Sequence, residues 1–95
     1  MKRFDDAIML VKAERERQFA KWGKQRHDVF TWMTILMEEV GEAAQAALHT
    51  KFGGKAKGTF GLEMIHVAAV AVQIIEWILE KKKKKNSLSS PRFSS

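Results

Sequence analysis

Apolar residues recur at helical spacing in three segments of this chain, at residues 3–21, 30–50 and 59–80. An apolar side chain at every third or fourth position is typical of an amphipathic helix. In the first segment the apolar side consists of Phe4, Ile8, Val11 and Phe19. The charged residues between them, Glu14 included, are expected on the solvent side. The pattern therefore predicts an all-α fold, a bundle of three main helices.

Residues with known roles at helix ends separate these segments. Gly23 follows the first segment and is suited to a left-handed C-terminal cap. Asp28 or Thr31 can cap the second helix, and Thr59 can cap the third. Three glycines and three lysines within residues 51–58 predict a basic, flexible loop.

The third segment is apolar on nearly all sides from residue 64 to 79. A soluble helix without a polar face is buried on several sides. Three helices cannot cover it, so we expect it at the centre of a homodimer or homotetramer. A membrane span is not expected, because the apolar stretch is shorter than about 20 residues and His66, Gln73 and Glu76 interrupt it. Gly41 lies inside the second helix, where glycine costs roughly 1 kcal/mol relative to alanine, so another helix is expected to approach it closely.

The charge is concentrated at one end of the chain. Residues 81–95 account for the whole net charge of +6, because the 11 basic residues of 1–80 are balanced by 11 acidic ones. We therefore divide the chain into a helical domain, 1–80, and a basic, Ser-rich tail, 81–95, without a specific nucleic-acid site. The absence of cysteine and the acids at Asp5 and Asp6, where a signal peptide needs apolar residues, favour a cytoplasmic protein.

Acidic residues occur within the apolar faces of the second and third helices. Glu39 and Glu42 lie among alanine, valine and isoleucine, and Glu63 and His66 lead directly into an apolar run. A buried carboxylate is costly unless it has a partner. On two packed helices these side chains would converge, and the carboxylates would raise one another's pKa values unless a cation is bound.

Oxygen ligands favour Mg²⁺, with Mn²⁺ as a second possibility. Protein-bound Mg²⁺ usually keeps water positions that phosphate oxygens can take. A polyphosphate substrate and metal-assisted hydrolysis are therefore expected. Glu38 and Glu39 are the residues expected to orient or deprotonate the attacking water.

The motifs Glu-Glu-Val-Gly-Glu-Ala-Ala at 38–44 and Glu-x-x-His at 63–66 resemble those of the MazG-like nucleoside triphosphate pyrophosphohydrolases. Residues 14–18 and 21–27 are similar to small phage and mobile-element members of that group. The resemblance implies an all-α, Mg²⁺-dependent enzyme that cleaves a (deoxy)nucleoside triphosphate to a monophosphate and pyrophosphate in nucleotide-pool house-cleaning. It also implies metal ligands at Glu39, Glu42 and Glu63. His66 stands where the group usually has aspartate, so it binds Mn²⁺, acts next to the ligands, or leaves one position empty.

Four residues around the first connection are candidates for substrate binding: Lys21, Trp22, Gln25 and His27. Lys21 could neutralise phosphate charge, and Trp22 could stack on a base. Gln25 belongs to the motif with the resemblance, and His27 could contact the base or cap a helix. Trp32 and Trp77, in contrast, are expected in the core or at an interface.

Two other functions account for parts of the same sequence. In a non-catalytic helical oligomer or partner-binding module, the acids would pair with basic residues. In an RNA- or DNA-binding protein, the lysine tail would contact phosphates. Glu76 and Glu80 are expected as ordinary surface acids in every case.

Overall fold

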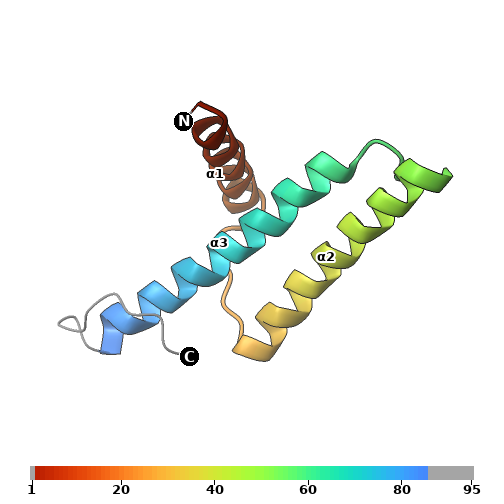
Figure 1. Ribbon diagram of the computed structural model, residues 1–95. Coiled ribbons are helices and arrows are strands. Elements are labelled where there is room, and N and C mark those ends of the chain that lie inside the picture. The colour runs from red at the N-terminus through yellow and green to blue at the C-terminus, as the bar shows by residue number, and fades with distance from the viewer. Residues whose placement is uncertain (1, 86–95) are drawn as a thin grey trace.

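The computed structural model of the protein describes residues 2–85, with side chains to residue 83. It contains the helices α1 (Lys2–Trp22), α2 (Val29–Phe52) and α3 (Phe60–Lys85), and no strand among the described residues (Figure 1). The predicted all-α fold of three helices is confirmed. The helix α3 includes Lys81–Lys85, so the first lysines of the predicted tail are helical, and residues 86–95 lie outside the described part of the chain.

The helix α3 is central to the arrangement (Figure 1). It runs antiparallel to α2, and α1 packs on α3 at another side. The helices α1 and α2 make no backbone contact with each other among the described residues. The chain therefore forms two helix–helix interfaces rather than a closed three-helix bundle.

The interior is small. Five apolar residues of the described part of the chain are buried, and the largest of them is Trp32, which is 1% exposed. The Trp32 ring packs edge-on against His27, with ring centroids 4.8 Å apart, and lies 6.4 Å from Trp77. The other four buried residues are Ala43, Ala46, Ala69 and Val70. The prediction that Trp32 belongs to the core is confirmed.

The helix ends follow the sequence signals with one exception. Asp28 caps α2 by accepting a hydrogen bond from the Thr31 amide at 2.7 Å. Gly23, with φ of 69°, ends α1, and its N–H donates to the Phe19 carbonyl. The Thr59 hydroxyl instead donates to the carbonyl of Ala56 at 2.7 Å, so it does not cap α3 through its side chain.

The connection between α2 and α3 is held by two side chains from the last turns of α2. His49 Nδ1 accepts a hydrogen bond from the Ala56 amide at 3.0 Å, and Thr50 Oγ1 accepts one from the Gly58 amide at 3.2 Å. Gly54 passes so close to the His49 ring that an added Cβ would meet it. These contacts give residues 53–59 a defined path.

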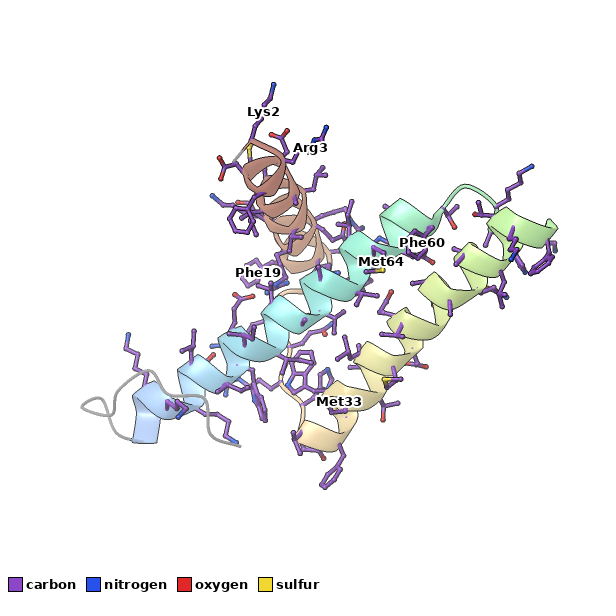
Figure 2. All side chains as sticks on the ribbon, in the orientation of Figure 1. Lys2, Arg3, Phe19, Met33, Phe60 and Met64 are labelled. Atoms are coloured by element: carbon purple, nitrogen blue, oxygen red, sulfur yellow. The ribbon has the colours of Figure 1, made fainter. Side chains whose placement is uncertain are left out.

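Many large apolar side chains remain exposed, on α1 and α2 as well as on α3 (Figure 2). No helix among the described residues approaches Gly41 closely, because no atom lies within 4 Å of where its Cβ would be. Residues Phe60–Lys83 are also long and apolar enough to cross a membrane by length and composition, with a mean hydropathy of 1.7. This helix thus reaches the length of a span that residues 64–79 alone lack, and Glu63, His66, Gln73 and Glu76 lie within it.

Candidate metal site between the three helices

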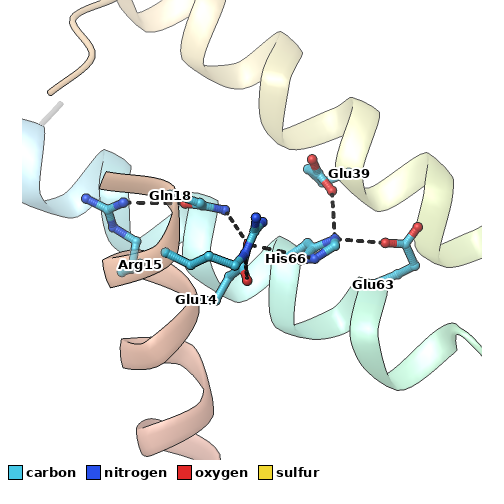
Figure 3. Close-up of polar contacts among 7 residues, drawn as sticks. Glu14, Arg15, Gln18, Glu39, Glu63 and His66 are labelled. Atoms are coloured by element: carbon cyan, nitrogen blue, oxygen red, sulfur yellow. Dashed lines mark hydrogen bonds and ion pairs between the residues drawn. The ribbon is translucent and has the colours of Figure 1, made fainter. Parts of the chain in front are cut away.

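His66, on α3, lies at the centre of a polar cluster to which all three helices contribute (Figure 3). Its Nδ1 atom lies 2.9 Å from Glu63 Oε1, one turn earlier on α3, and 3.9 Å from Glu39 Oε2 on α2. Its Nε2 atom lies 3.8 Å from Glu14 Oε2 on α1. The imidazole thus stands among three carboxylates from three different helices.

Glu14 is the buried charged residue of this cluster. Arg17 Nε and Nη2 donate to its two carboxylate oxygens at 2.8 and 2.6 Å, and Gln18 Nε2 donates at 3.1 Å. The hydrogen bonds from Arg17 lower the pKa of the Glu14 carboxyl despite its burial. The expectation that Glu14 faces solvent is therefore wrong, because α1 turns this side chain toward α3.

The pKa of the Glu39 carboxyl is shifted in the opposite direction to that of Glu14. Burial raises the pKa of its carboxyl, and the neighbouring Glu42 carboxylate raises it further. Its Oε2 atom is buried and has no hydrogen-bond partner. A carboxylate oxygen withdrawn from water without a donor is poorly stabilised, so Glu39 is suited to a positively charged ligand.

Three of the four predicted metal ligands come together. Glu39, Glu63 and His66 each offer one ligand atom, and these atoms lie within 4.8 Å of one another. Two ligands on opposite sides of Mg²⁺ lie about 4.2 Å apart, since each bond is about 2.1 Å. A small side-chain rotation would therefore allow the three groups to hold a divalent ion. Glu42 is exposed and lies outside this group, although it lines the same cavity.

The cluster opens into a cavity of about 450 Å³ between α1, α2, α3 and the first connection. A volume between 300 and 1,000 Å³ is typical of small-molecule sites. Three of the predicted substrate-binding residues line it, namely Trp22, Gln25 and His27. Its wall also contains Arg17, the charge partner of Glu14, which sequence reasoning had not selected.

Two predicted site residues lie away from this cavity. Glu38 is exposed and does not line it. Lys21 is also exposed, and its ammonium group lies over the Trp22 ring, 4.6 Å from the centroid. Neither of these two side chains therefore lies beside the carboxylates of the cluster.

Comparisons with protein-family models, curated proteins and solved structures give no match for this chain.

Two ion pairs connect α3 to α1 and to the first connection. Arg15 Nε donates to Glu76 Oε1 at 2.7 Å and joins α1 to α3. Lys24 Nζ lies 2.6 Å from Glu80 Oε1 and fixes the first connection against α3. The expectation that Glu76 and Glu80 are ordinary surface acids is therefore incomplete, since both connect separate segments of the chain.

One signal in the sequence could have identified Glu14 and Gln18. Together with Val11 they recur at helical spacing, at positions 11, 14 and 18, and the structure shows that all three are at least partly buried. A division of positions into apolar and polar does not reveal this buried set, because Glu14 and Gln18 are polar themselves.

Proposed function

We propose that the protein hydrolyses (deoxy)nucleoside triphosphates to nucleoside monophosphates and pyrophosphate with the help of a divalent metal ion. The observation that carries the proposal is the convergence of Glu39, Glu63 and His66, with an unpartnered buried oxygen on Glu39. A buried carboxylate oxygen without a donor, such as Glu39 Oε2, is stabilised by a cation. The resemblance of residues 38–44 and 63–66 to the MazG-like group supports the same reaction.

In this proposal Glu39, Glu63 and His66 would hold Mg²⁺ or Mn²⁺. The bound ion would offset the charge of the phosphates and lower the pKa of a water molecule. The imidazole of His66 shifts the preference of the set toward Mn²⁺, because nitrogen is a poor ligand for Mg²⁺. Assays should therefore compare both metals.

The other residues of the cavity would bind the substrate and accept a proton. Arg17 is about half exposed, so its guanidinium can contact a phosphate oxygen while it remains bonded to Glu14. The Trp22 ring can stack on the base, and Gln25 and His27 can donate or accept hydrogen bonds at its edge. A cavity of this size and polarity suits one nucleotide.

The reaction transfers the α-phosphoryl group to water. The water oxygen bonds to the α-phosphorus, the bond to the bridging oxygen breaks, and pyrophosphate leaves. The proton that water loses goes to a carboxylate of the cavity wall and from there to solvent. Glu42 is suited to this role because it lines the cavity and is exposed, whereas Glu38 lies outside.

The test combines a binding and an activity measurement. Each dNTP is incubated with the pure protein and Mg²⁺ or Mn²⁺, and pyrophosphate is measured. In parallel, the melting temperature is recorded with and without metal, since saturation at 100 times Kd contributes about 2.7 kcal/mol of stability. Glu39→Gln should abolish both effects, and Glu16→Gln, an exposed acid on α1, should retain them. Orthophosphate as the sole product, or no metal-dependent shift, would contradict the proposal.

The exposed apolar surface favours a second candidate, a non-catalytic helical oligomer. Between residues 2 and 83, nineteen large apolar side chains are exposed, including Phe4, Phe30 and Phe52, whereas five apolar residues are buried. In that case the cluster at His66 would be structural, and Glu39→Gln would leave oligomeric state and partner binding unchanged. The metal-dependent melting shift separates the two functions.

A further inference from the structure

One side of α3 is exposed and apolar, and it leads into the lysines at the end of the helix. Val72, Ile75 and Leu79 recur on it at intervals of three and four residues, and they are 37%, 43% and 43% exposed. The same spacing continues to Lys82, which is partly exposed, and to Lys83, which is exposed. We call these five residues the lysine face of α3. Figure 1 shows that this end of α3 projects beyond α1 and α2.

The lysine face lies on the side of α3 away from the candidate metal site. The residues of α3 that line the cavity of that site are His66, Val70 and Gln73. With about 3.6 residues in each turn, these three lie on the opposite side of the helix from Ile75 and Leu79. A ligand of the lysine face would therefore leave the cavity open, and a function of this face is independent of the proposed enzymatic reaction.

The apolar surface continues from α3 onto α1. A groove with a volume of about 560 Å³ lies between the two helices, and Val72 lines it together with Ile8 and Phe19 of α1, which are 51% and 57% exposed. The charged residues of its lining are two basic and two acidic ones, namely Lys12, Arg15, Glu16 and Glu76. The groove therefore enlarges the apolar surface without adding net charge.

Positive charge accumulates at the end of α3. Residues 81–95 contain six basic residues and no acidic one. The acid that precedes them is Glu80, whose Oε1 atom lies 2.6 Å from Lys24 Nζ and 3.8 Å from Arg26 Nη2. The first connection thus already balances the charge of Glu80, and the lysines keep a net positive charge beside the apolar residues.

A cluster of four or more lysines beside the apolar side of a helix is typical of proteins that bind anionic membrane surfaces. We propose that the lysine face of α3 binds the surface of a bilayer that contains anionic lipids. Val72, Ile75 and Leu79 enter the boundary between the headgroups and the acyl chains, and Lys82 and Lys83 contact the anionic headgroups.

The helix α3 lies on the membrane in this proposal rather than across it. A span formed by Phe60–Lys83 would carry Glu63 and His66 into the hydrocarbon, where ionisable side chains are costly. It would also separate His66 from Glu14 and Glu39 of the other two helices. Binding at the surface keeps these contacts, because it uses the opposite side of α3.

The apolar residues of the lysine face favour a membrane over a nucleic acid. The phosphates of a nucleic acid attract basic side chains, and such contacts would leave Ile75 and Leu79 exposed to water. A lipid surface uses both kinds of residue, because apolar burial and electrostatic attraction add to each other in interfacial binding.

Sedimentation of the full chain with lipid vesicles tests the electrostatic part. Wild-type protein should bind phosphatidylcholine vesicles that contain phosphatidylserine, and it should bind pure phosphatidylcholine vesicles far more weakly. Lys82→Gln combined with Lys83→Gln should weaken binding about 30-fold, since each lysine near an anionic surface contributes about 1 kcal/mol, or about fivefold. The matched control is Lys55→Gln combined with Lys57→Gln, which removes two exposed lysines from the second connection and should retain the affinity.

A second pair of variants tests the apolar part. Ile75→Ser combined with Leu79→Ser should weaken binding about tenfold or more, because both side chains would be buried at the lipid surface. Met37→Ser combined with Leu48→Ser is the control, since these side chains of α2 are also exposed, and it should retain the affinity. All four positions are exposed, so circular dichroism should show the helix content of the wild type in both variants.

Several results would overturn the proposal. Two of them are unchanged binding of either lysine-face variant, and equal binding of the wild type to both kinds of vesicle. Binding to duplex DNA with the same lysine dependence, and not to vesicles, would assign the face to a nucleic acid instead. Resistance of the bound protein to extraction with alkaline carbonate would indicate a span. A lower molar mass of the variant at Ile75 and Leu79 than of the wild type would assign the face to a second copy of the chain.

Discussion

Replacing Glu14 by glutamine tests whether the buried end of the polar cluster stabilises the fold. The carboxylate accepts two hydrogen bonds from Arg17 and one from Gln18. Glutamine keeps the shape and length of the side chain but removes its charge. The variant therefore isolates the electrostatic part of the interaction with Arg17.

The magnitude follows from the exposure of the two partners. The Glu14 side chain is 9% exposed and that of Arg17 is 53% exposed, so the guanidinium can be solvated when the charge is removed. Hydrogen bonds to charged groups contribute about 1.5–3 kcal/mol, and partial exposure reduces this. We expect Glu14→Gln to lower the free energy of unfolding by about 1–2 kcal/mol, which corresponds to a Tm decrease of about 5–15 °C for a domain of this size.

The effect should depend on pH in a direction set by the lowered pKa of Glu14. A carboxyl whose pKa is lower in the folded state stabilises the fold fully above its unfolded pKa, which is near 4.5. This contribution is lost as the pH falls through the folded pKa. The difference in Tm between wild type and Glu14→Gln should therefore be constant near neutral pH and shrink below the unfolded pKa.

Thermal unfolding followed by circular dichroism, in the presence of EDTA, measures this difference. Glu16→Gln is the matched control, because Glu16 lies on the same helix and is exposed. Surface substitutions of this kind change stability by about 0.5 kcal/mol or less. Equal melting temperatures for the two variants at neutral pH would refute the stabilising role of Glu14.

Three further predictions concern the core, the second connection and the metal site. Trp32→Ala should lower the free energy of unfolding by about 3–5 kcal/mol, because it empties the centre of the core, and urea titration measures the loss. Gly54→Ala should destabilise the fold more than Gly58→Ala: both glycines have positive φ, but only at Gly54 would the new methyl group meet the His49 ring. The melting temperatures of the two variants provide the comparison. In EDTA at neutral pH, Glu39→Gln should raise the free energy of unfolding by roughly 0.5–1 kcal/mol. The reason is that the pKa of Glu39 is raised, so its charged form is disfavoured in the fold. An unchanged or lower Tm of the variant would contradict this.

The three helices and most of their ends could be predicted because their signals are local. Gly23 and Asp28 act within one turn of a helix end, through a single backbone or side-chain hydrogen bond. The spacing of Glu63 and His66 likewise places them one turn apart on one helix, where their side chains meet. These features follow from neighbouring residues and need no knowledge of the rest of the fold.

The position of α1 could not be predicted in the same way, and the environment of Glu14 follows from it. The charged residues of α1 read as a solvent face, but its packing on α3 brings Glu14 to His66, 52 residues away in the sequence. The exposed apolar side chains of α2, such as Phe30 and Met37, are a similar case, because the apolar pattern alone does not tell which face of a helix the chain covers. The sequence by itself thus determined the helices, most of their ends and the residue types able to bind a metal. The tertiary structure decided which carboxylates share one volume, because burial and electrostatic coupling depend on distances between helices that no local pattern encodes.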